Sequence, residues 1–83
     1  MSKLILQLDN TDLSYDTTNA TLHPTTNRTV LFNVERDGEV VEYKLIASTK
    51  EIANAVREDI ANKQDVILNP AEFCSLRTKV KDG

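Results

Sequence analysis

Several residue types are scarce in this chain of 83 residues, which contains one cysteine, one histidine, two glycines and no tryptophan. A single cysteine, Cys74, cannot form an internal disulfide, so we expect a reduced compartment, the cytoplasm. The glycines are Gly38 and Gly83, which leaves no glycine-rich loop to bind a phosphate. Cys74 and His23 could form a catalytic dyad only through a tertiary contact, and no third group that would orient them is indicated. We therefore expect no catalytic residues and no cofactor.

Long apolar runs and a strong excess of one charge are also absent. No run approaches the roughly 20 apolar residues of a membrane-spanning helix, and residues 1–9 do not form a signal peptide, so we expect no membrane partner. The net charge of −3 argues against a surface built to bind nucleic acid. The oxygen-rich segment Asp9–Asp16 lacks the spacing and the glycine of an EF-hand, so we expect no metal site.

What the chain does contain is a clear β-hairpin pattern over residues 28–46. Asp37-Gly38 is a favoured two-residue turn, and placing it at the tip brings apolar residues opposite one another on one face of the two strands. The predicted pairs are Arg36–Glu39, Val34–Val41, Phe32–Tyr43 and Val30–Leu45. The agreement between turn and pairing predicts both the hairpin and its register.

The remaining segments predict a short list of elements. Residues 3–8 alternate as a half-buried strand does, and residues 9–28 form a long Thr-rich loop or an extra edge strand. The segment Ser48–Glu51 matches a capping box, so we expect a helix that starts there, packs through Ile52, Val56 and Ile60, and ends near residues 62–63. Residues 66–68 are typical of a short buried strand.

The C-terminal segment shows a second helix-start signal. Asn69 would be the N-cap, Pro70 the first helical residue, and Phe73, Leu76 and Val80 follow at helical spacing. The sequence therefore predicts one α+β domain over residues 1–83. Its expected architecture is a small antiparallel meander of three to four strands, with one helix packed on the sheet and a second short C-terminal helix.

One candidate site lies on the face of the hairpin that points away from the predicted helix. Leu31 and Ile46 are diagonal neighbours there and, together with Ile5, could form a small apolar patch on a charged face. One interpretation is that residues 9–28 fold back and cover this patch through Leu13, Tyr15 or Leu22. The other is that the patch contacts another protein, with the hairpin carboxylates opposing a basic partner surface. Those carboxylates are Glu35, Glu39 and Glu42.

These observations favour a non-enzymatic intracellular protein that works by binding another protein. Accessory or inhibitor proteins that phages and mobile elements encode against host machinery have this size and acidic balance. A second hypothesis is a self-assembling or virion-associated structural subunit, which would form homo-oligomers and in which the Thr-rich residues 9–28 would be an arm ordered only in the assembly. A third is a nucleic-acid-binding module that uses the basic C-terminal residues Arg77, Lys79 and Lys81.

Overall fold

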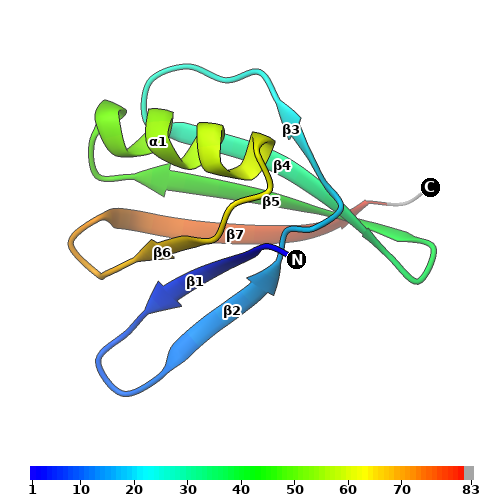
Figure 1. The fold of residues 1–83 in the computed structure, drawn as a ribbon, viewed down its shortest axis with the longest axis horizontal. Coiled ribbons are helices and arrows are strands. Elements are labelled where there is room, and N and C mark those ends of the chain that lie inside the picture. The colour runs from blue at the N-terminus through cyan, green and yellow to red at the C-terminus, as the bar shows by residue number, and fades with distance from the viewer. Residues whose placement is uncertain (82–83) are drawn as a thin grey trace.

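The computed structural model describes residues 1–81 and shows a small α+β domain with one helix and two sheets (Figure 1). One sheet has the strand order β3-β4-β5-β7, and the other has the order β2-β1-β6. The elements are β1 (Lys3–Gln7), β2 (Asp12–Asp16), β3 (Ala20–His23), β4 (Thr29–Arg36), β5 (Glu39–Ala47), α1 (Lys50–Ala61), β6 (Val66–Leu68) and β7 (Phe73–Lys81). In the part of the chain that the structure describes, no helix has the length and apolarity needed to cross a membrane.

The β4–β5 hairpin has the register that the sequence predicts, and all four predicted pairs are confirmed. Asp37 and Gly38 both have positive φ, at 51° and 80°. Two positive φ angles define the type I′ turn, whose twist matches that of the flanking strands, and an Asp-Gly pair adopts it readily. The turn chemistry and the apolar alternation therefore select the same pairing.

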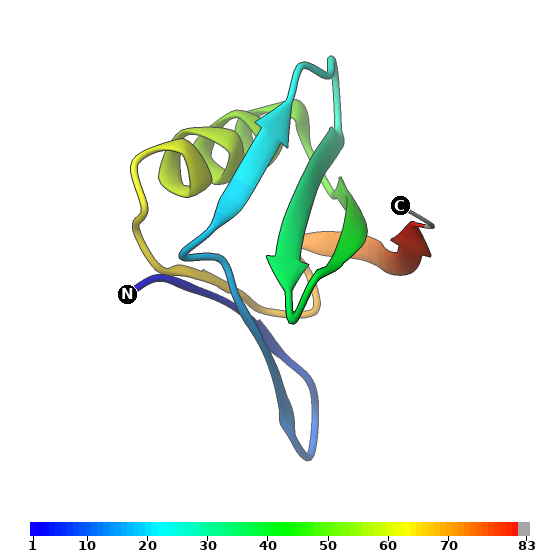
Figure 2. The ribbon, with the colours of Figure 1, turned by 90° about the vertical axis from the view of Figure 1, so that its right-hand side faces the viewer.

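The core lies between the four-stranded sheet and two elements that pack on the same face, α1 and the smaller sheet (Figures 1 and 2). Phe32 is fully buried and stacks on Tyr43 with ring centroids 5.0 Å apart. Tyr15 of β2 meets the same Tyr43 ring edge-on at 5.4 Å, which joins the smaller sheet to the larger one. The helix adds Val56 and Ile60, at 2% and 0% exposure.

The smaller sheet was not predicted, because its central pairing joins distant parts of the chain. β1 runs parallel to β6, with Leu4 beside Val66 and Leu6 beside Leu68. The segment that we expected to be a loop or an extra edge strand contains two strands, β2 and β3. β2 pairs with β1 and β3 pairs with β4, so the expected simple meander is replaced by two separate sheets.

The predicted capping box is wrong by one residue. The N-cap of α1 is Thr49, whose side chain accepts a hydrogen bond from the Ile52 amide at 3.1 Å. The Ser48 hydroxyl instead donates to the Ala71 carbonyl at 2.7 Å, which ties the helix start to the loop before β7. The helix ends at Ala61, close to the predicted boundary.

The predicted C-terminal helix is wrong, because residues 73–81 form strand β7. The local signal at Asn69 is real: its side chain accepts from the Ala71 amide, and Glu72 accepts from the Asn69 amide, both at 2.9 Å. These bonds close a turn that leads into a strand. Leu76 and Val80 pair with Leu45 and Val41 of β5, whose edge would otherwise be unpaired.

The loop between β3 and β4 is fixed to the helix by one side chain. The Arg57 guanidinium donates to the Thr29 carbonyl at 2.6 Å and to the Asn27 carbonyl at 3.3 Å. The Arg57 contacts thus tie the start of β4, the strand that carries the predicted apolar patch, to α1. Ser2 and Thr17, which precede β1 and β3, are fully buried and share a hydroxyl hydrogen bond of 3.0 Å.

Candidate functional site on the outer face of the large sheet

The four-stranded sheet has a second face, opposite α1 and the smaller sheet, which we call the outer face. Successive side chains of a strand point to opposite faces, so the register assigns every outward position. The outer face comprises Thr21 and His23 of β3, Thr29, Leu31, Asn33 and Glu35 of β4, Val40, Glu42, Lys44 and Ile46 of β5, and Ser75, Arg77, Lys79 and Lys81 of β7.

Leu31 and Ile46 form an apolar pair on this face, at the end away from the β4–β5 turn. Leu31 is paired with Lys44 and Ile46 with Thr29, so the two apolar side chains are diagonal neighbours, and both are half-buried. Ile5 does not join them, because it lies in the smaller sheet between Ser14 and Ile67. The apolar patch is therefore smaller than the sequence suggested.

Residues 9–28 do not cover the outer face. Tyr15 packs against Tyr43 inside the domain, and Leu22 is paired with Phe32 and points to the core. Leu13 is 41% exposed on β2, in the other sheet. The interpretation in which this segment folds back over the patch is thus wrong, because Tyr15 and Leu22 pack against the core and Leu13 lies in the other sheet.

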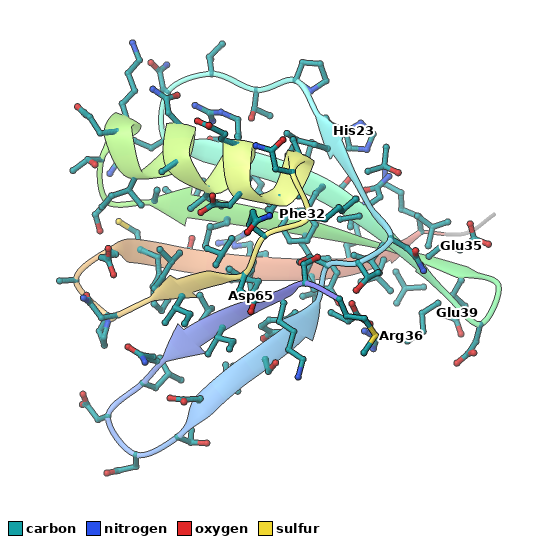
Figure 3. The ribbon with its side chains drawn as sticks, in the orientation of Figure 1. His23, Phe32, Glu35, Arg36, Glu39 and Asp65 are labelled. Carbon is teal, nitrogen blue, oxygen red and sulfur yellow. The ribbon has the colours of Figure 1, made fainter. Side chains whose placement is uncertain are left out.

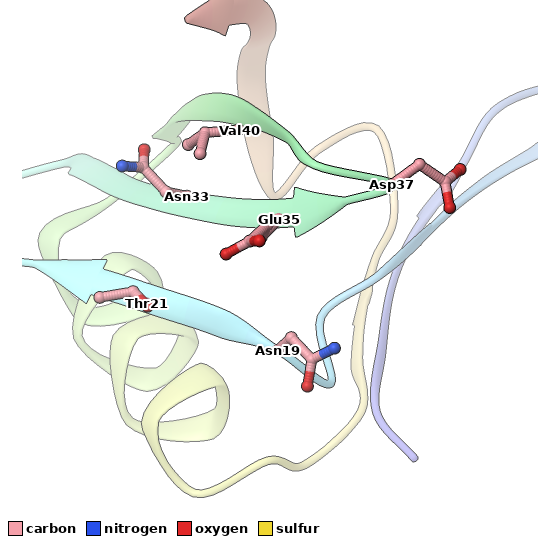
Figure 4. Close-up of a pocket in the computed structure, with 6 residues that line it drawn as sticks. All are labelled: Asn19, Thr21, Asn33, Glu35, Asp37 and Val40. Carbon is pink, nitrogen blue, oxygen red and sulfur yellow. The ribbon is translucent and has the colours of Figure 1, made fainter. Parts of the chain in front are cut away.

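The three predicted carboxylates occupy different environments. Glu35 borders a shallow depression of about 440 Å³ at the end of the sheet near the β4–β5 turn, where β3 stops and leaves the face open (Figure 4). In Figure 4, Glu35 extends between the ribbons of β4 and β3, with Thr21 across from it. Glu39 is paired with Arg36 at the hairpin tip, on the opposite side of the sheet from Glu35 and Glu42, and so is not part of the outer face (Figure 3).

Glu42 differs from Glu35 because it already has a partner within the chain. Its carboxylate accepts from the Lys81 ammonium at 2.8 Å. This hydrogen bond holds the pKa of the Glu42 carboxyl below its ordinary value. Glu35 is therefore the carboxylate of this face that is better placed to meet a basic group of another molecule.

The basic residues of the C-terminal segment belong to the same face, which the sequence analysis missed. Because residues 73–81 are extended, Arg77, Lys79 and Lys81 all point outward, and Arg77 lies directly opposite Lys44. A second depression, of about 290 Å³, lies between these two cations and is also lined by Ile46 and Ser75. The outer face thus has four cations and two carboxylates, although the whole chain has a net charge of −3.

A signal for this arrangement was present in the sequence. Over residues 76–81, apolar or Thr residues alternate strictly with Arg or Lys. This is the two-residue period of a strand with one exposed face, and it competes with the weaker helical spacing of Phe73, Leu76 and Val80.

Two polar atoms on the outer face lack hydrogen-bond partners. Nε2 of His23 and Oδ1 of Asn33 are buried and make no hydrogen bond within the described part of the chain. Buried polar atoms usually have a hydrogen-bond partner, so these two atoms are a local exception on β3 and β4.

His23 and Cys74, the two residues considered as a catalytic dyad, lie far apart in the sheet. His23 is on β3 and Cys74 on β7, the two opposite edges of the four-stranded sheet. Cys74 is exposed, and its sulfur lies 3.9 Å from an Arg28 guanidinium nitrogen. Among residues 1–81 no group of three or more His, Cys, Asp or Glu side chains is arranged to hold a metal ion.

Comparison of the chain with protein-family models, with curated proteins and with solved structures gave no match.

Proposed function

We propose that this protein acts by binding another protein through the outer face of the four-stranded sheet, without catalysing a reaction. The observation that carries the proposal is the composition of this face. At the end away from the β4–β5 turn it holds the half-buried pair Leu31 and Ile46, and no segment among residues 1–81 packs over them. Protein interfaces combine such apolar side chains, which become dry on binding, with polar and charged ones that stay wetter.

The distribution of charge supports an oriented complex. Glu35 and Asp37 border the depression near the hairpin tip, whereas Lys44 and Arg77 border the other depression. A partner surface with basic groups at one end and acidic groups at the other would match both. Such complementarity contributes more to orientation and association rate than to affinity, and salt screens it.

The arrangement of aromatic residues favours a protein over a nucleic acid. Binding of single-stranded nucleic acid commonly uses exposed aromatic rings beside cations. Here Phe32 and Tyr43 stack in the core, and Tyr15 packs on Tyr43. The cations of β7 are thus not accompanied by stacking surfaces on the outer face.

The structure gives less support to a self-assembling subunit with a mobile arm. That hypothesis placed residues 9–28 outside the fold until assembly. The segment instead supplies β2 and β3, which pair within the chain.

The proposal is tested by quantitative capture of proteins from a lysate of the source cells with three purified baits. These are the wild type, Leu31→Lys and Leu13→Lys. Leu31 and Leu13 are both partly exposed strand leucines, but only Leu31 is on the outer face. We expect a protein that is retained by the wild type and by Leu13→Lys and is lost with Leu31→Lys, provided that both variants show the wild-type circular dichroism spectrum. Equal retention by all three baits would contradict the proposal.

A further inference from the structure

Strand β7 has a free edge whose backbone hydrogen-bonding groups have no partner strand within residues 1–81. It is a nine-residue edge strand of the four-stranded sheet, and it is hydrogen-bonded to β5 on one side only. Within residues 1–81, no backbone hydrogen bond apart from that ladder involves Cys74–Lys81. Alternate N–H and C=O groups of an edge strand point away from the sheet, where they can pair with an added strand.

The side chains of β7 restrict which strand could be added. Arg77, Lys79 and Lys81 project from the outer face at intervals of about 7 Å, the two-residue repeat of a strand. The other face of the same edge carries two apolar side chains, Leu76, which is partly buried, and Val80, which is 54% exposed, with Thr78 between them. An incoming strand would meet cations on one face and apolar side chains on the other.

These cations are compensated to different degrees among residues 1–81, because Lys79 lies directly opposite Glu42 and its charge helps to lower the pKa of that carboxyl. The salt bridge found among residues 1–81 joins Lys81 to Glu42, and neither Arg77 nor Lys79 has a carboxylate within 4.0 Å there. Arg77 also lies directly opposite Lys44, and like charges in that position repel one another. An added carboxylate beside Arg77 would relieve this repulsion.

The same charges disfavour a second copy of the chain at this edge. If the β7 strands of two copies paired antiparallel about Lys79, that residue would face its own equivalent and Arg77 would face Lys81. Cations on an edge strand commonly prevent such pairing. They leave the edge open to a strand of opposite charge.

We propose that the free edge of β7 binds an extended acidic segment of a partner protein, which adds to the sheet as a fifth strand. Acidic side chains of that segment alternate with apolar ones, so that the carboxylates meet Arg77 and Lys79 while the apolar side chains cover Leu76 and Val80. Main-chain hydrogen bonds supply affinity in this mode of recognition, and the alternating side chains supply specificity. The inference rests on the proposed protein-binding function and specifies the chemistry of the partner.

The test uses fluorescein-labelled synthetic peptides of nine residues, the length of β7, and measures their binding by fluorescence anisotropy. One peptide alternates glutamate with valine, and the control peptide alternates lysine with valine. We expect the glutamate peptide to bind and the lysine peptide not to bind at the same concentrations. Binding of the lysine peptide with an affinity equal to that of the glutamate peptide would overturn the inference. It would also be overturned if an oligothymidylate of equal charge bound while the glutamate peptide did not.

Charge-reversal variants locate the binding. Arg77→Glu should weaken binding of the glutamate peptide by about tenfold, because one attractive cross-strand pair becomes repulsive. The variant should remain folded, since the new carboxylate faces Lys44. Lys50→Glu reverses an exposed charge at the start of α1 and should change the affinity by less than about twofold. Equal affinity of the two variants would show that the peptide binds elsewhere.

Backbone methylation tests strand addition itself. Two further glutamate peptides carry N-methyl groups on alternate residues, one set on the odd positions and the other on the even positions. In an added strand only one of these sets points its N–H groups toward β7. We expect one methylated peptide to lose binding and the other to keep it, whereas equal effects of both would contradict strand addition.

The Leu31→Lys variant separates this inference from the proposed function. Leu31 lies on β4, and β5 stands between β4 and β7, so peptide binding at the free edge should be unchanged within about twofold. If Leu31→Lys abolishes capture of the cellular partner and the glutamate peptide fails to bind, the edge inference is overturned while the outer face stands. If the glutamate peptide binds as expected and Leu31→Lys leaves capture intact, the edge inference is supported and the outer-face proposal fails.

Discussion

Truncation of Phe32 to alanine should remove a large part of the stability of this domain. Phe32 is fully buried at the centre of β4, and its ring stacks on Tyr43 with an interplanar angle of 10°. Replacing a buried phenylalanine with alanine costs about 3–5 kcal/mol through lost burial and the cavity that remains. The stacked aromatic pair contributes about 0.5–1.5 kcal/mol beyond burial, which places the expected loss in the upper half of that range.

The loss of stability expected for Phe32→Ala is large relative to the whole free energy of unfolding. At about 0.1 kcal/mol per residue, 83 residues give a free energy of unfolding of roughly 8 kcal/mol. A loss of about 4 kcal/mol would halve that value and lower the Tm by roughly 16–32 °C, at about 4–8 °C per kcal/mol for a domain of this size. Phe32→Ala should therefore fold at 25 °C but unfold at a much lower urea concentration than the wild type.

The matched control is the preceding residue. Leu31 lies on the same strand but points to the outer face and is only half-buried, so Leu31→Ala should cost less than about 1 kcal/mol. Urea denaturation followed by circular dichroism gives both values. Comparable losses for the two variants, or a loss below about 1 kcal/mol for Phe32→Ala, would refute the assignment of faces on which the candidate site depends.

Two further predictions concern single hydrogen bonds. Thr49→Ala should destabilise the protein by about 1 kcal/mol in urea denaturation, because the N-cap of α1 is lost. Ser48→Ala should cost less, because the hydrogen bond from Ser48 to the loop is exposed. The reverse order would show that the capping box starts at Ser48. Lys81→Ala should raise the pKa of Glu42 toward its ordinary value, because the hydrogen bond from Lys81 is the main cause of the lowered pKa. NMR titration of the side-chain carboxyls measures this pKa, and an unchanged value would count against the ion pair. Because the lowered pKa belongs to the folded state, the pair stabilises the fold above the ordinary pKa of the carboxyl, and this contribution is lost as the pH falls through the lowered value.

The sequence was sufficient for the elements whose determinants are local. The β4–β5 hairpin was predicted with its register because the Asp37-Gly38 turn and the alternation of its strands lie within 19 residues, 28–46. The helix was predicted to within a residue or two at each end, because caps and apolar spacing are also local.

The remaining elements depend on contacts between distant residues. The parallel pair of Leu4 with Val66 has no local signal, and the smaller sheet could not be inferred without it. At the C-terminus, Asn69 accepts the local hydrogen bond that an N-cap would accept, but it closes a turn, and pairing with β5 decided that a strand follows.

The residues of the candidate site were predicted only where they depend on the hairpin. Leu31, Ile46, Glu35 and Glu42 share the outer face because the hairpin register fixes them, and the same register places Glu39 opposite Arg36 on the other side of the sheet. The basic half of the face was missed because it depends on β7 being a strand.

The most direct test of the central claim, that the outer face is the binding surface, is NMR chemical-shift mapping of the isotopically labelled protein with its captured partner. We expect the perturbed amides to cluster at the outward positions of β4, β5 and β7, around Leu31, Ile46 and Arg77, and the amides of β1 and β2 to remain unchanged. Perturbations confined to the β1–β2 hairpin or to α1, with the outer face unaffected, would contradict the claim.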